Sequence, residues 1–501
     1  MIHKKLKLYL KLVWFVIFLA GISLFSYAQI TLTIEQALDI AEENNPQMKN
    51  TKLNLERTQY LLDAQRASLK PQFSMNVNPL NYSQTRSFDT RYSEWYTNKN
   101  LSSNGTFQAE LPLIWTDGTL SLTNRFGWQD SESVNQNGIN MNTAFTNNLA
   151  LRYNQPIFTY NRQKMDFQRL EYDYENSGIS YALQRLRTEQ SITRQFYQVY
   201  LAQNSLEISM EEFENAKNNY AIISAQVEAD LAAREELFQA EVNLASAESS
   251  VESNDVSLKN AKDELKQTLG IQLNEEINVL ADIVVIPILF DEEKAIQSGL
   301  SSRMELRQRE INMELADLTM ITTKALDEFR GNISLALGIT GDNRQLANIY
   351  DNPTQSPSVS ITFSIPIFDW GQRKARIQAQ RTSQTIAQLD YDNQRVDIEL
   401  GIRQSLRSLA NLSTQISIAE KNVRNAQLTY ELNEIRYREG DLTGLQMSQY
   451  QTQLSNARIS YVRAQINYKN ELLNLKILTL YDFENNQPII PVRELQNISM
   501  Y

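Results

Sequence analysis

Apolar residues recur at every seventh position in two long stretches of the chain. The first series is Leu237, Leu244, Val251, Leu258 and Leu265, and the second is Met447, Leu454, Tyr461, Tyr468 and Leu475. Alanines follow three positions after several members of each series, so large and small residues share one seam, as a coiled coil requires. The two series coincide after a shift of 210 residues, the repeat interval, as do the Pro-Ile-Phe segments at 156–158 and 366–368. This self-similarity predicts a tandem duplication.

Both halves predict the same order of elements: a helix, strands, a very long helix, a tight tip and a returning helix. Helical spacing over residues 161–228 predicts a helix of about 100 Å, and a second long helix runs from 371 to a tip at 438–444. Alternating positions predict about four principal strands per chain, with a further hairpin at 107–128 that turns at Asp117 and Gly118. We therefore divide the chain into a first repeat at 29–270, a linker at 271–292, a second repeat at 293–480 and a C-terminal tail at 481–501.

The segment 1–28 reads as a secretory signal peptide. Four lysines precede an apolar stretch, and Ser26-Tyr27-Ala28 forms a small-x-small cleavage site before Gln29. Removal of these lysines changes the net charge from −11 to −15. An exported chain this acidic is not expected to bind nucleic acid, whose phosphates attract basic surfaces.

The composition excludes most catalytic and metal chemistry. The chain has no cysteine, and its one histidine, His3, lies in the predicted signal peptide. Thiol nucleophiles, imidazole bases and the usual zinc or copper ligands are therefore absent from the exported chain. A carboxylate hydrolase would need two acids about 5–10 Å apart in a rigid cleft, and the pattern predicts no cleft. We expect no catalytic, cofactor-binding or metal-binding residues and no enzyme.

The predicted strands have the length needed to cross a bilayer at a tilt, roughly 9–13 residues. Strands of this kind also occur in soluble sandwiches, but strands next to helices of about 100 Å favour a membrane β-barrel. Four strands cannot close a barrel, so we expect an oligomer in which three chains supply twelve strands. The helices would continue this barrel as a tube. A periplasmic coiled-coil tether without a pore is the alternative.

Several motifs together carry a family resemblance. They are the opening at 32–38, Asn44-Asn45-Pro46, the two Pro-Ile-Phe strand ends, and Tyr437-x-x-Gly440 before the second tip. With them the chain resembles the outer-membrane efflux proteins of the TolC family over essentially its whole exported length. The resemblance implies an α+β homotrimer, with a β-barrel in the outer membrane of a Gram-negative-type bacterium and a helical barrel in the periplasm. It also implies an exit duct for efflux or type I secretion, whose partners are a periplasmic adaptor, an inner-membrane pump and outer-membrane lipid.

The resemblance also suggests residue roles. Pro156 and Pro366 would mark the transitions from strand to helix. The family's best-known member closes its periplasmic mouth with acids just after the second tip, at positions matched here by Gln446 and Gln449. An acidic gate would therefore be relocated, and its candidates are Asp230, Glu235, Glu236 and Asp441, unless these are only solvated charges near helix starts. The candidate adaptor contacts are Leu231, Ala232, Gly440, Leu442 and Thr443.

The hairpin at 107–128 departs from the family's four strands per chain. It would lengthen the barrel wall, cap the barrel outside, or replace residues 72–78 as a barrel strand, and the sequence does not decide among these.

Overall fold

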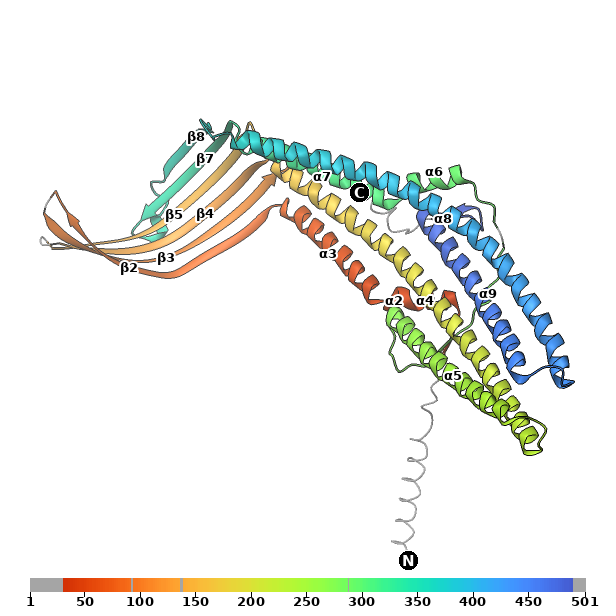
Figure 1. The fold of residues 1–501 in the computed structure, drawn as a ribbon. Helices are drawn as coiled ribbons and strands as arrows, with labels where there is room; N and C mark the ends of the chain where they lie inside the picture. Colours follow the sequence, from red (N-terminus) through yellow and green to blue (C-terminus); the bar gives the residue numbers. More distant parts are fainter. Residues whose placement is uncertain (1–29, 92, 136–137, 287, 490–501) are drawn as a thin grey trace, which may run out of the picture. The chain divides into compact units, whose positions relative to one another are not determined.

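The computed structural model describes residues 30–91, 93–135, 138–286 and 288–489, and Figure 1 shows their fold. The predicted signal peptide (1–28) and the end of the predicted tail (490–501) lie outside these ranges. The chain forms two compact units. The helical unit holds the described parts of Met1–Leu53, Ile179–Met304 and Arg395–Tyr501, and the sheet unit holds those of Asn54–Gly178 and Glu305–Gln394.

An antiparallel sheet of six strands dominates the sheet unit, in the order β2-β3-β4-β5-β7-β8 (Figure 1). The strands are β2 (Gln72–Asp89), β3 (Glu94–Leu113), β4 (Gly118–Asn135), β5 (Gly138–Ile157), β7 (Arg330–Asn343) and β8 (Thr354–Ser364). Strands that follow one another along the chain are also neighbours in the sheet. Strands β2 and β8 are therefore its two edges.

The prediction of about four strands is wrong, because this sheet has six. Residues 81–104 show no apolar period, yet they complete β2 and begin β3, with pairs from Asn81↔Ser102 to Asp89↔Glu94. Main-chain hydrogen bonds hold these pairs, and such bonds do not depend on an apolar face. The predicted hairpin at 107–128 is confirmed as part of β3 and β4, which lie within the sheet between β2 and β5.

The two faces of the sheet differ in polarity. Residues directly opposite each other in an antiparallel sheet point to the same face. One row across the strands is apolar, and it reads Phe73, Ala109, Leu122, Leu151 and Leu337. A row three residues further along β2 lies on the opposite face. It is polar and reads Asn76, Thr106, Arg125, Asn148 and Thr340. The apolar side chains are exposed in the single chain, with Phe73 at 70% and Leu337 at 53%.

Two helical hairpins account for most of the remaining chain. The helices are α2 (Ile34–Asn44), α3 (Pro46–Ser68), α4 (Arg162–Glu228), α5 (Arg234–Leu269), α6 (Glu292–Ser302), α7 (Met304–Ala325), α8 (Gln372–Arg438) and α9 (Gly444–Thr479). Helices α4 and α8 each have 67 residues, and α5 and α9 each have 36. Each returning helix lies beside the C-terminal part of its long helix (Figure 1). The predicted long helices and tips are confirmed.

Over the described ranges, the chain has no helix that combines the length and the apolar character needed to cross a membrane.

The core of the helical unit packs α2 and two short parallel strands, β1 (Ile30–Leu32) and β6 (Ile277–Val279), against α4 and α5. Its least exposed members on the long hairpin are Ile192, Phe196, Val199, Leu265 and Leu269, at 1% or less. One repeat interval later, Ile402, Leu409 and Leu475 are equally buried at 0%, whereas Leu406, the counterpart of Phe196, is half-buried. Most of these helix positions therefore face inward in both hairpins.

Local capping explains where the first helices begin and end. Thr33 and Gln36 form a capping box at the start of α2. The chain breaks between the first two helices, because α2 ends at Asn44 and α3 begins at Pro46. The side chain of Asn45 accepts a hydrogen bond from the amide of Met48 and donates one to the carbonyl of Thr268, at 2.9 and 2.6 Å. This break therefore rests against the end of α5.

A substitution of Gly270, the glycine that ends α5, tests the contact between α5 and the break after α2. Gly270 has φ of +75°, and a Cβ there would lie 2.3 Å from the carbonyl oxygen of Asn44. Gly440 has φ of +86° with nothing within 4 Å, so it is the matched control. We expect Gly440→Ala to cost about 1 kcal/mol and Gly270→Ala clearly more. Thermal unfolding followed by far-UV circular dichroism checks this, and equal midpoints would contradict the steric account.

Candidate functional sites at the strand-to-helix junctions and the hairpin tips

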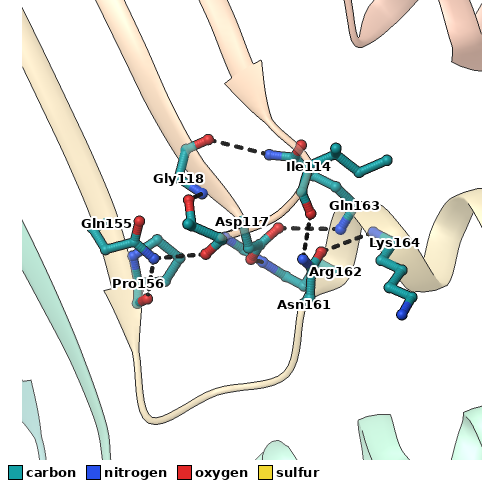
Figure 2. Close-up of polar contacts among 10 residues, drawn as sticks. Ile114, Asp117, Gly118, Gln155, Pro156, Asn161, Arg162, Gln163 and Lys164 are labelled. Atoms are coloured by element: carbon teal, nitrogen blue, oxygen red, sulfur yellow. Dashed lines mark hydrogen bonds and ion pairs between the residues drawn. The ribbon is translucent and has the colours of Figure 1, made fainter.

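The first strand-to-helix junction leads from β5 to α4. Pro156 lies in the last pairs of β5, opposite Asn332. Asn161 precedes the helix, and its side-chain oxygen accepts a hydrogen bond from the amide of Lys164 at 2.8 Å. Its side-chain nitrogen donates to the carbonyl of Ile114 in the turn between β3 and β4. Asn161 therefore caps α4 and also binds this turn (Figure 2).

The turn in its own right supplies a second cap for α4. One carboxylate oxygen of Asp117 accepts the amide of Gln163 at 3.1 Å, and the other pairs with the guanidinium of Arg162 at 3.0 Å (Figure 2). The Asp117 side chain is only 4% exposed. The side-chain amide of Gln155 donates to the carbonyl of Thr116 at 2.6 Å. The hairpin β3–β4 is thus fastened to the start of α4, where a carboxylate is favoured.

The second junction, from β8 to α8, is capped locally. Pro366 lies beyond the last residue of β8, in the segment before α8. The carboxylate of Asp369 accepts the amides of Gly371 and Arg373 at 2.9 and 2.8 Å. The hydrogen bond from the Arg373 amide, and then that from the Gly371 amide, lower the pKa of Asp369 below its ordinary value. Helix α8 therefore obtains its cap from its own approach segment, whereas α4 has a local cap, Asn161, and a second one, Asp117, from a separate hairpin.

The two tips have the same backbone turn. The amide of Leu231 donates to the carbonyl of Gln226, and that of Asp441 donates to Arg436, at 2.7 and 2.9 Å. Asp230 has φ of +58° at the position that Gly440 occupies, with φ of +86°, in the second tip. Asp tolerates this conformation better than most residues. Asp230 therefore has a backbone role besides its charge.

The structure places the predicted tip residues in different environments. Asp230, Glu235, Glu236, Asp441 and Gln449 are exposed. Gln446 completes a capping box with Thr443 at the start of α9. Leu231 is 79% exposed, whereas Leu442 is 9% exposed and buried. The candidate adaptor contacts are therefore not equivalent in the single chain.

A polar contact near the tips joins the two hairpins. The hydroxyl of Tyr437 on α8 donates to the side-chain oxygen of Asn219 on α4. Burial, and then the charge of Glu236, raise the pKa of Tyr437, so the hydroxyl keeps its proton at neutral pH. A Cβ on Gly444 would lie 3.0 Å from the Asn219 side chain, so the α9 start approaches the same residue. A groove of about 590 Å³ lies beside this contact.

The sequence reasoning noted Asp117 as a turn residue and Tyr437 as a motif residue, but missed both contacts. Tyr437 and Asn219 are 218 residues apart. Asp117 and Gln163 are 46 apart. No local pattern pairs such positions. The Asn161 cap alone has a local signal, because Asn is a preferred residue before a helix.

Comparisons with known sequences match parts of the chain. A family model described as "Outer membrane efflux protein" matches residues 329–479. The cation efflux system protein CusC of Escherichia coli K12 is 21% identical over 295 residues, which cover 58% of this chain and 62% of that protein. The probable outer membrane lipoprotein SilC of Salmonella typhimurium is 20% identical over 287 residues, which cover 56% of this chain and 61% of that protein. The chain therefore spans less than two thirds of the length of these relatives.

Solved structures share the fold over nearly the full length. The CmeC outer membrane channel of Campylobacter jejuni superposes with a TM-score of 0.69 at 14% identity, covering 93% of this chain and 89% of that chain. A structure of CusC gives 0.66 at 15% identity, covering 91% and 95%. The open state of the MtrE outer membrane channel of Neisseria gonorrhoeae gives 0.65 at 14% identity, covering 90% and 89%. The predicted α+β fold, with long helices and antiparallel strands, is confirmed.

The Asp117 cap yields a prediction. Asp117→Ala removes the acceptor for the Gln163 amide and the partner of Arg162, which for a helix cap costs about 0.5–2 kcal/mol. Hydrogen exchange measured by mass spectrometry should become faster at residues 162–166. Asp369→Ala is the matched control and should affect only the start of α8. Unchanged exchange at the start of α4 in Asp117→Ala would show that Asn161 caps this helix unaided.

Proposed function

We propose that this chain, which belongs to the outer membrane efflux protein family, is the exit duct of a tripartite efflux or type I secretion system. The predicted family resemblance and the predicted location in the outer membrane of Gram-negative bacteria are confirmed. In this role the protein conducts substrates passively from a pump to the exterior. No bond is made or broken, in keeping with the expectation that it is not an enzyme.

The observation that carries this proposal is the sheet. One face presents exposed apolar side chains such as Phe73, Leu151 and Leu337, and the opposite face is polar. An exposed apolar surface of this extent requires a covering medium. Outer-membrane lipid on the apolar face and water on the polar face satisfy both surfaces, as in a membrane barrel.

The open edges of the sheet support a homotrimer with a closed barrel. Main-chain groups on the outer sides of β2 and β8 need partners wherever lipid excludes water. Further copies of the chain supply such partners. The long hairpins would line up beside those of the other copies as a helical tube in the periplasm, where an adaptor and an inner-membrane pump meet the tips.

A tandem duplication accounts for the equal halves of the helical unit. It is supported by the equal lengths of α4 and α8, and of α5 and α9. The repeat interval also separates the buried pairs Ile192 and Ile402, Val199 and Leu409, and Leu265 and Leu475. In this proposal the repeats are 29–270 and 293–480, joined by the linker at 271–292.

The tips would form the periplasmic gate and the adaptor contact. The exposed acids Asp230, Glu235, Glu236 and Asp441 would meet those of the other copies at the mouth of the tube. Their mutual repulsion opposes close approach, so a closed state needs polar links between hairpins. The Tyr437–Asn219 hydrogen bond is such a link. Leu231, at 79% exposure, is the apolar tip residue best placed to meet an adaptor.

Native mass spectrometry of the detergent-extracted outer-membrane fraction tests the duct. We expect a trimer of chains from which the segment 1–28 has been removed. A soluble monomer or dimer that is absent from this fraction would rule out the duct and favour a periplasmic tether.

The link between the hairpins gives a prediction for the gate. Tyr437→Phe removes the hydroxyl that binds Asn219, a loss of about 1 kcal/mol per copy. We expect the resting conductance of single channels in planar bilayers to rise. Tyr430→Phe is the matched control, because Tyr430 lines the same groove and, among the described residues, its hydroxyl has no hydrogen-bond partner. Equal conductance in the two variants would show that the link does not hold the tips together.

A further inference from the structure

The hairpin β3–β4 is an integral part of the sheet and is not an appendage of it. Strand β3 pairs with β2 from Gln72↔Glu110 to Asp89↔Glu94, and with β4 from Thr97↔Val134 to Leu113↔Gly118. Strand β4 pairs in turn with β5 from Thr119↔Asn154 to Asn135↔Gly138. The hairpin therefore separates β2 from β5 by two full strands. The hairpin adds two strands to the sheet and so widens it from edge to edge.

Chain direction makes the two edges complementary to each other. Successive strands in the sheet are antiparallel, and their number is even. Strands β2 and β8 therefore run in opposite directions, so β8 of one copy can pair antiparallel with β2 of the next. Their free edges are 18 and 11 residues long, which permits a seam over most of β8.

The apolar face continues to both edges. On β2 it ends with Phe73, Met75 and Val77, and on β8 with Val359 and Ile361, all at least 55% exposed. Because a slip of one residue would turn every side chain of a strand to the other face, only registers that keep these residues on one side preserve the apolar surface. The seam is thus restricted to alternate registers.

We propose that the hairpin β3–β4 widens the duct: three copies join edge to edge, β8 of one to β2 of the next, and close an eighteen-stranded wall. This inference rests on the proposed trimeric duct, in which a second copy of this chain occupies each sheet edge, and adds the strand count of the wall and the pairing of β8 with β2. Barrel diameter grows roughly in proportion to strand number. The bore at the level of the sheet is therefore about 1.5 times as wide as that of a twelve-stranded wall.

The width has a consequence for cargo. A barrel of about eight strands is filled by its own side chains, whereas one of 16–18 strands leaves an aqueous channel. The polar face that would line this bore carries Arg125, Asn148 and Thr340 in one row. The wall then presents charged and amide groups to water over a broad opening. It suits hydrated, bulky cargo more than small apolar molecules that bind a narrow pocket.

Cysteine cross-linking in the full-length trimer tests the wall, since the chain has no cysteine of its own. One set combines Phe73→Cys with Leu149→Cys, Leu151→Cys or Tyr153→Cys. In an eighteen-stranded wall β2 and β5 are three strand spacings apart, about 14 Å, which exceeds the reach of a disulfide. We expect no cross-link in this set. Phe73→Cys with Ala109→Cys is the positive control, because these residues are register partners on β2 and β3.

A second set tests the seam. It combines Ile361→Cys on β8 with Phe73→Cys, Met75→Cys or Val77→Cys on β2. We expect one of these pairs to give a trimer-sized band on denaturing gels after oxidation. End-on electron microscopy of the wild-type trimer gives an independent strand count that does not depend on any variant.

The outcomes separate this inference from the proposed function. A cross-link between β2 and β5 in a membrane trimer, or twelve strands in the end-on view, would overturn the wide wall and leave the duct intact. A membrane trimer that forms the β2–β3 control but no seam cross-link would overturn the β2–β8 pairing. Absence of any membrane trimer would overturn the duct itself, and this inference with it.

Discussion

The unpaired main-chain groups along the edges of β2 and β8 are the constraint on which the rest of the architecture depends. A flat or open edge of this length pairs readily with further strands unless it is blocked. Here it adjoins a face with exposed apolar residues such as Phe73 and Ile361, which also needs a cover. One arrangement relieves both: edge-to-edge assembly with lipid outside. The proposed duct follows from this combination more than from any individual side chain.

The long helices depend on packing in a comparable way. A helix of 67 residues gains little from intrinsic propensity, and most of its stability comes from a buried face. The buried faces of α4 and α8 recur at the repeat interval, as Val199 and Leu409 show. Helix α5 also leaves apolar side chains uncovered, because Phe238, Val242 and Val256 are each more than half exposed. A tube built from several copies would bury them.

The two strand-to-helix junctions differ because the hairpin β3–β4 takes part in one of them. Helix α8 is capped by Asp369, whose carboxylate accepts the amides of Gly371 and Arg373. Helix α4 begins with an Asn161 cap and adds Asp117 from the hairpin turn. The hairpin thus supplies a carboxylate at the position where the first half lacks an aspartate of its own. Strands that widen the sheet also position the helix that follows it.

The sequence by itself determined the two helical hairpins and their tips. These features depend on residues within one or two turns of each other, so periodicity reveals them. Only the tertiary structure decided that the sheet has six strands, that Leu442 is buried while Leu231 is exposed, and that Tyr437 meets Asn219. Each of these depends on pairing between distant segments, through main-chain bonds that most sequences can form or through side chains that have no local signal.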